Sequence, residues 1–131
     1  MTGVDTNVLL RFLVDDEEEQ GARVNRFLSN SRRSQEYVYV SCIVLCEAAW
    51  ILRRGYGWPK PRILSHLEAV LGSDVFMIEA DDVVREAIRL SKEGPGDFPD
   101  YPIDQLNAAR GCRFTVTFDR ALRSDPAFFV F

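Results

Sequence analysis

The side chains best suited to chemistry in this sequence are carboxylates at the ends of predicted elements. Asp5 ends a short apolar segment, Asp119 follows an apolar run at 114–118, and Asp100 opens the predicted helix before that run. In open parallel sheets, ligands bind beyond the carboxyl ends of the strands, where the loops converge. We therefore expect these three carboxylates to lie at one edge of a sheet.

A fourth carboxylate, Glu47, interrupts the otherwise apolar segment 43–52. A carboxylate buried in apolar surroundings is costly unless it is paired, protonated or bound to a metal ion. Two interpretations stay open at this point. Glu47 is either a partly exposed helix residue that bonds to Arg53 or Arg54, or a member of the acidic cluster.

Four converging carboxylates would repel one another unless a cation held them together. Hard divalent ions prefer all-oxygen ligands, and Mg²⁺ typically takes one or two carboxylates together with waters and substrate phosphate. Such an ion polarises a phosphate and lowers the pKa of a bound water. The chemistry that these residues indicate is phosphodiester hydrolysis.

Composition limits the class of protein. With 131 residues, 47% hydrophobic and 11% aromatic, the chain is long and apolar enough for one folded domain. Sixteen basic and twenty acidic residues give a net charge of -4, which argues against coating nucleic acid by bulk charge but permits a local basic groove. No signal peptide or membrane-spanning run is expected, so we predict a cytoplasmic location and no membrane partner.

The three cysteines are too few for a disulfide framework. Cys42 and Cys46 could in principle hold zinc together with His66, but no Cys-x-x-Cys pair supports such a site. We expect reduced, partly buried thiols instead.

The elements that must position the carboxylates follow from the hydrophobic periodicity. We expect strands at 2–5, 37–40, 75–78, 114–118 and 127–131, and helices at 6–13, 15–28, 41–54, 60–71, 81–90 and 100–110. Strands separated by helices of this length pair in parallel through crossover helices. The expected fold class is α/β: a single domain over residues 1–131, with a central, mostly parallel sheet flanked by helices in three layers.

Four short motifs resemble those of PIN-domain ribonucleases. They are Asp5-Thr6-Asn7-Val8-Leu9, then Cys46-Glu47 in its apolar helix, then Asp97-Phe98-Pro99-Asp100-Tyr101-Pro102-Ile103, and finally Thr117-Phe118-Asp119-Arg120. Their order and spacing agree over nearly the whole chain, and four motifs in order are far more specific than one. Among PIN domains, the sequence is most similar in kind to the VapC-type toxins of bacterial toxin–antitoxin pairs.

The resemblance implies a metal-dependent endoribonuclease that hydrolyses RNA with a metal-activated water, leaving 5′-phosphate and 3′-hydroxyl ends. Its catalytic residues would be Asp5, Glu47, Asp100 and Asp119. Asp5, Asp100 and Asp119 would bind Mg²⁺, or Mn²⁺ in its place. Glu47 would act through a water or as a base.

The resemblance also implies supporting residues and partners. Thr6 and Asn7 would bond to Asp5 or to the phosphate, and Thr117 would orient Asp119. The partners would be the RNA substrate, a cognate antitoxin whose tail enters the active-site groove, and a second copy of the chain in a homodimer.

The third motif departs from the family pattern. Pro102 replaces an aliphatic residue, which the first turn of a helix tolerates, and Asp104 replaces an alanine. Asp104 would either add a fifth acid to the cluster or face solvent. Asp97 is an alternative to Asp100 as metal ligand. We favour Asp100, because the family motif has its aspartate three residues before an isoleucine and only Asp100 has this spacing to Ile103.

Arginines near these motifs are candidates for contact with RNA phosphates. They are Arg11, Arg53, Arg54 and Arg120, with Arg110 and Arg113 nearby. Local arginines of this kind would reconcile a net negative charge with a polyanionic substrate.

Two alternatives to the nuclease remain. The first is a catalytically weak PIN-like module that only binds RNA or an antitoxin, which the departures at Pro102 and Asp104 favour. The second is an aspartyl-phosphate phosphatase with Asp5 as nucleophile. That chemistry usually needs a second acid two residues later, where this sequence has Asn7.

Overall fold

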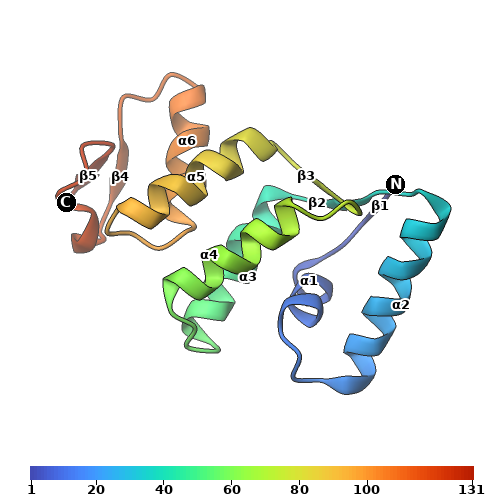
Figure 1. Ribbon diagram of the computed structural model, residues 1–131. Helices are drawn as coiled ribbons and strands as arrows, with labels where there is room; N and C mark the ends of the chain where they lie inside the picture. The colour runs from blue at the N-terminus through green and yellow to red at the C-terminus, as the bar shows by residue number, and fades with distance from the viewer.

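Helices and short parallel strands alternate along the chain in the computed structural model, which describes residues 1–131 (Figure 1). In chain order the elements are β1 (Thr2–Gly3), α1 (Thr6–Leu13), α2 (Glu18–Ser34), β2 (Val38–Val40), α3 (Cys42–Arg54), α4 (Lys60–Leu71), β3 (Phe76–Ile78), α5 (Asp81–Glu93), α6 (Asp100–Ala109), β4 (Thr115–Thr117), the 3₁₀ turn η1 (Arg120–Leu122) and β5 (Phe128–Val130). Every predicted helix and strand is present. All five strands are shorter than predicted, and α2 spans Glu18–Ser34 rather than 15–28.

The five strands form two separate parallel sheets. The first has the order β1-β2-β3, with Thr2 opposite Val38 and Val38 opposite Phe76. The second consists of β4 and β5, with Thr115 opposite Phe128. Figure 1 shows the two sheets at different ends of the molecule, separated by α3, α4 and α5. The α/β class and the parallel pairing are confirmed, and the structure adds that the central sheet is divided.

Helix α3 forms the middle of the molecule. Its N-cap is Ser41, whose Oγ accepts a hydrogen bond from the Val44 N–H at 3.3 Å, and such caps satisfy an otherwise unpaired donor. One face of the helix, with Leu45, Ala48 and Leu52, is fully buried. The helix predicted at 41–54 is therefore confirmed, and it carries Glu47 on the opposite side.

The core is one continuous cluster of 27 buried apolar residues. Its most enclosed members include Leu52, Leu67 and Val84 of the three central helices, each with no exposed surface. No helix is both long and apolar enough to cross a membrane.

Helix α6 starts at Asp100, as its sequence predicts. Pro102 occupies the first turn, where no intrahelical N–H donor is needed. The ring of Tyr101 is buried against Phe128 of β5, with centroids 6.3 Å apart. This packing fixes the second sheet to α6 and so sets the position of the carboxylate at the helix start.

Candidate active site

Asp100 is the most perturbed carboxyl group in the chain. It is half-buried at the start of α6, and its Oδ2 accepts a hydrogen bond from the Asp97 N–H at 3.1 Å. Burial, followed by the negative charge of nearby Asp119, raises the pKa of Asp100 to about 6. The turn in front of it is tight, because a Cβ added at Gly96 would lie 2.9 Å from Asp100 Oδ2.

Asp119 follows β4 and caps the turn η1. Its Oδ1 accepts a hydrogen bond from the Ala121 N–H at 2.9 Å, and its own N–H donates to Thr117 Oγ1 at 3.0 Å. Its side chain is exposed. Its negative charge raises the pKa of Asp100, so these two predicted catalytic acids are neighbours.

Two cations border this carboxylate pair. Arg53 on α3 forms an ion pair with Asp97 at 3.3 Å. Lys60, at the start of α4, donates to the carbonyl oxygens of Gly94 and Gly96 at 2.7 and 2.8 Å. Burial lowers the pKa of Lys60, while the charges of Asp97 and Asp100 oppose that shift. Sequence reasoning does not identify Lys60 as a site residue, since no motif contains it and only the tertiary fold brings it to the turn.

Asp104 has a different position from either of the two expected for it. It is buried, with 8% of its surface exposed. Its Oδ1 accepts a hydrogen bond from Thr115 Oγ1 at 2.7 Å, and Thr115 in turn accepts from Asn107 Nδ2 at 3.1 Å. Asp104 therefore neither faces solvent nor faces the acidic pair; it joins α6 to β4.

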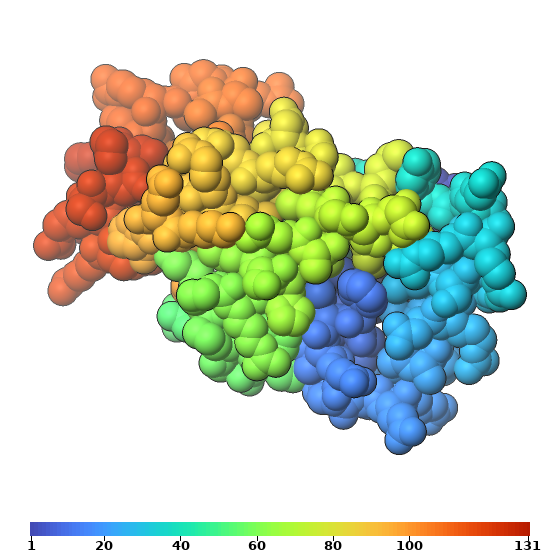
Figure 2. All heavy atoms as spheres, in the orientation of Figure 1, coloured from blue at the N-terminus to red at the C-terminus, as the bar shows by residue number.

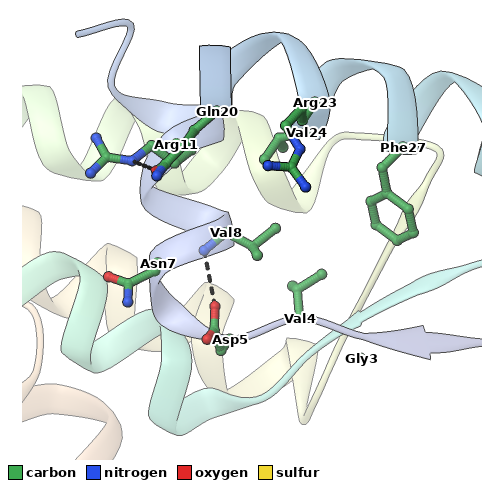
Figure 3. Close-up of a pocket in the computed structure, with 10 residues that line it drawn as sticks. All are labelled: Gly3, Val4, Asp5, Asn7, Val8, Arg11, Gln20, Arg23, Val24 and Phe27. Atoms are coloured by element: carbon green, nitrogen blue, oxygen red, sulfur yellow. Dashed lines mark hydrogen bonds between the residues drawn. The ribbon is translucent and has the colours of Figure 1, made fainter. Parts of the chain in front are cut away.

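Asp5 lies in another part of the molecule, at the N-cap of α1. Its Oδ1 accepts a hydrogen bond from the Val8 N–H at 3.0 Å, and the side chain is exposed. It borders an open groove of about 620 Å³, which Figure 3 shows between β1, α1 and α2. Val8 and Phe27 are among the apolar side chains that line the groove.

The residues predicted to support Asp5 have separate surroundings. Asn7 is exposed beside Asp5 in the groove, and Thr6 is buried. Neither side chain forms a hydrogen bond with Asp5. Arg11 lines the same groove and bonds to Gln20 and Asp16, at 2.8 and 2.9 Å.

Glu47 is exposed on α3, on the same face as Ile43 and Trp50. It forms no ion pair with Arg53 or Arg54, since Arg53 binds Asp97. Its apolar neighbours on this face are also exposed: 75% of the surface of Ile43 and 58% of that of Trp50 are accessible to solvent. This face of α3 is uncovered in the single chain.

The structure thus divides the predicted acids into two groups. Asp97 and Asp119 lie near Asp100, and the negative charge of each raises the pKa of Asp100. Asp5 and Glu47 are absent from the charges that act on Asp100, and no three acidic, histidine or cysteine side chains of one chain converge closely enough to hold a metal ion. Cys42, Cys46 and His66 are likewise not gathered into such a group, and the His66 ring lies against Trp58 with centroids 4.7 Å apart.

The acidic pair nevertheless has the chemistry that a divalent cation needs. Both donors are carboxylates, and Mg²⁺ is commonly held by one or two of them with waters and phosphate completing its ligands. Asp100 is raised in pKa partly because Asp119 repels its charged form. A cation placed between the two would remove that repulsion, so these residues fit a metal ion.

Comparison with known proteins identifies the family. Residues 4–124 match the model of the PIN domain, so the chain belongs to the PIN-domain family. It is 30% identical over 120 residues to the VapC ribonuclease of Aquifex aeolicus (strain VF5). That match covers 92% of this chain and 88% of the relative.

Proposed function

We propose that this protein is a metal-dependent endoribonuclease and the toxin of a toxin–antitoxin pair. The observation that carries the proposal is the neighbouring position of Asp100 and Asp119 beyond the carboxyl end of β4, where burial and the charge of Asp119 raise the pKa of Asp100. A relative named a ribonuclease, matched over nearly the full length of both chains, supports the same activity.

The metal ion, Mg²⁺ or Mn²⁺, would supply a Lewis acid that polarises the scissile phosphate and acidifies a water. Asp100 and Asp119 would hold it. The expected third ligand is Asp5, which one chain holds apart from this pair. Glu47 would accept the proton of the attacking water, directly or through a second water. Attack of water on the phosphorus with departure of the 3′ oxygen leaves a 5′-phosphate and a 3′-hydroxyl.

Contact with RNA would come from arginines that border these carboxylates. Arg120 directly follows Asp119 and is exposed, and Arg54 at the end of α3 is also exposed without an ion pair. Arg11 and Arg53 are engaged with Asp16 and Asp97, so phosphate would compete with a carboxylate for them. Asn7, Thr6 and Thr117 are proposed to keep Asp5 and Asp119 in position.

The proposed partners are RNA, an antitoxin protein and a second copy of the chain. All three cysteines are free thiols, which agrees with action in the reducing cytoplasm. The uncovered face of α3 around Glu47 is one surface on which a protein partner would bury apolar area.

The test is cleavage of RNA by the purified chain, freed of any bound antitoxin, with Mg²⁺ or Mn²⁺ and then with chelator. We expect Asp100→Asn to lower cleavage at least about a hundredfold, as removal of an electrostatic catalytic group does. Asp82→Asn is the matched control, because Asp82 is exposed on α5 and forms no ion pair. Equal cleavage by folded Asp100→Asn and Asp82→Asn proteins would contradict the proposal.

One observation keeps a binding module as the second candidate. The acids of a single chain do not converge into a metal site. A module of this kind would bind RNA or antitoxin with no metal-dependent cleavage, so the same assay, combined with RNA binding measured in chelator, separates the two functions.

A further inference from the structure

Strand β1 has one edge with no partner. The N–H groups of Thr2 and Val4 donate to Tyr37 and Tyr39 on the β2 side. Because successive residues of a strand direct their backbone groups to opposite sides, Gly3 faces the other edge. No strand pairs there, and a Cβ added at Gly3 would meet nothing within 4 Å.

Strand β4 has an equivalent unpartnered edge. The Thr115 N–H donates to the Ala127 carbonyl, and the Thr117 carbonyl accepts from the Phe131 N–H, so both residues bond on the β5 side. Val116 therefore directs its backbone groups away from β5, and its side chain is 47% exposed. An isolated pair of parallel strands is unusual, because parallel sheets are normally covered and extended by further strands.

Apolar surface surrounds both free edges. Beside β4, the rings of Phe118 and Phe131 lie tilted against each other, with centroids 5.0 Å apart, and are 81% and 71% exposed. Beside β1, the groove is lined by Val4, Val8 and Phe27 among others (Figure 3). Exposed apolar area of this kind is normally covered by a partner.

The β4 strand of this chain is held away from its own β1. Thr115 is bonded to buried Asp104 of α6, and the turn before α6 is tied to α3 and α4 through Arg53 and Lys60. Figure 2 shows the carboxyl-terminal segment and the amino-terminal helix on opposite sides of the visible face, with α4 and α5 between them. Pairing within the chain would break these contacts, and pairing with a second copy would not.

We propose that two copies of the chain exchange these edges, β4 of each adding in parallel to β1 of the other. The contact is reciprocal, as a two-fold dimer requires. It unites β1-β2-β3 of one chain with β4-β5 of its partner in a five-stranded sheet and buries the exposed aromatic rings. Strand addition of this kind satisfies backbone donors and acceptors on both edges at once.

The exchange also assembles the catalytic acids, and this part of the inference rests on the proposed function. Asp5 lies two residues beyond the end of β1, and Asp119 lies two residues beyond the end of β4. When the two strands run in parallel with their ends aligned, Asp5 of one chain is beside Asp119 and Asp100 of the other. Each active site then takes residues from both chains.

Complementation between two inactive variants tests the shared site. Asp5→Asn and Asp119→Asn chains are each inactive alone. Mixed by unfolding and refolding together, half of the dimers contain one chain of each kind. In such a dimer one site carries both substitutions and the other carries neither, so the mixture recovers about a quarter of wild-type cleavage. If each site lay within one chain, every site would carry a substitution and the mixture would stay inactive, which overturns the proposal.

A disulfide test gives a readout without activity. In a Cys112→Ser background, Thr2→Cys and Val116→Cys together place thiols opposite each other in the aligned register, at a separation that a disulfide spans. Oxidation should produce a covalent dimer on a denaturing gel, whereas either cysteine variant alone should not give this dimer in comparable yield. An intrachain bond, or no bond, overturns the exchange.

The two tests separate failure of the exchange from failure of the nuclease proposal. If the Thr2→Cys, Val116→Cys variant forms the covalent dimer but the wild-type protein cleaves no RNA, the proposed function is contradicted and the exchanged dimer stands. A wild-type protein that cleaves RNA, with no complementation and no interchain bond, supports the nuclease and overturns the exchange.

Discussion

At the scale of single residues, the raised pKa of Asp100 links the stability of the fold to the proposed activity. Asp100 is charged at neutral pH although burial and Asp119 oppose that charge. The folded protein therefore keeps an unfavourable charge at this position. Function, rather than stability, accounts for an acid at this position. The charge of Asp100 should therefore lower the unfolding free energy of the protein when no metal ion is bound.

We expect Asp100→Asn to raise the unfolding free energy at pH 7 by about 1 kcal/mol, a value discounted because the group is only half-buried. The pKa is about 6 in the folded chain against 3.8 as reference. The wild type therefore loses stability as the pH rises from about 4 to about 6, and the penalty is complete above that. Asparagine keeps an acceptor for the Asp97 N–H.

Thermal unfolding of both proteins at pH 4 and pH 7, in chelator, measures this effect. The difference between variant and wild type should be near zero at pH 4 and largest at pH 7. Addition of Mg²⁺ should raise the melting temperature of the wild type more than that of the variant, because only the wild type retains both carboxylates. A variant less stable than the wild type at pH 7 would contradict the assignment.

At the scale of elements, the free edge of β4 makes the sharpest prediction. Proline lacks the N–H donor, and within a sheet it is tolerated where that N–H would face solvent. Val116→Pro should therefore leave each chain folded but remove one donor from the edge that pairs with a second copy. We expect a shift from dimer to monomer in sedimentation, while Val116→Ala stays dimeric. A Val116→Pro protein as dimeric as Val116→Ala would show that this edge is not used.

The elements were largely predictable because their signals are local. Ser41 before an apolar run marks the start of α3, and Asp100 with Pro102 in the first turn marks the start of α6. The division of the sheet was not predictable, because the pairing of β4 depends on contacts such as Thr115 with Asp104 and Lys60 with Gly94. These join residues 11 and 34 positions apart, and no periodicity reports them.

The candidate site was predictable only in part for the same reason. Motif spacing identifies Asp100 and Asp119, which the fold brings together. The same spacing identifies Asp5 and Glu47, which one chain places apart from that pair. Sequence order contains no information on which strand edges meet, so the division of the sheet between β1 and β4 required the structure.

At the scale of the whole molecule, a site shared between chains ties activity to concentration. Cleavage per chain should fall as the protein is diluted below the dissociation constant of the dimer, since a monomer has no complete site. The oxidised Thr2→Cys, Val116→Cys dimer should show no such fall. Initial rates over a thousandfold dilution, for both proteins, measure the difference. A constant rate per wild-type chain throughout the range in which sedimentation detects dissociation would contradict a shared site.

The backbone contacts of the three proposed metal ligands have a consequence for the choice of ion. Asp5 and Asp119 each give Oδ1 to a backbone N–H, and Asp100 gives Oδ2 to the Asp97 N–H. Each carboxylate thus turns one oxygen to the chain and leaves one for a ligand. Monodentate donors of fixed direction match the small, octahedral coordination sphere of Mg²⁺, whereas Ca²⁺ is larger and often takes both oxygens of a carboxylate. If these three side chains hold the ion, we expect Mg²⁺ to support cleavage and Ca²⁺ to support it poorly.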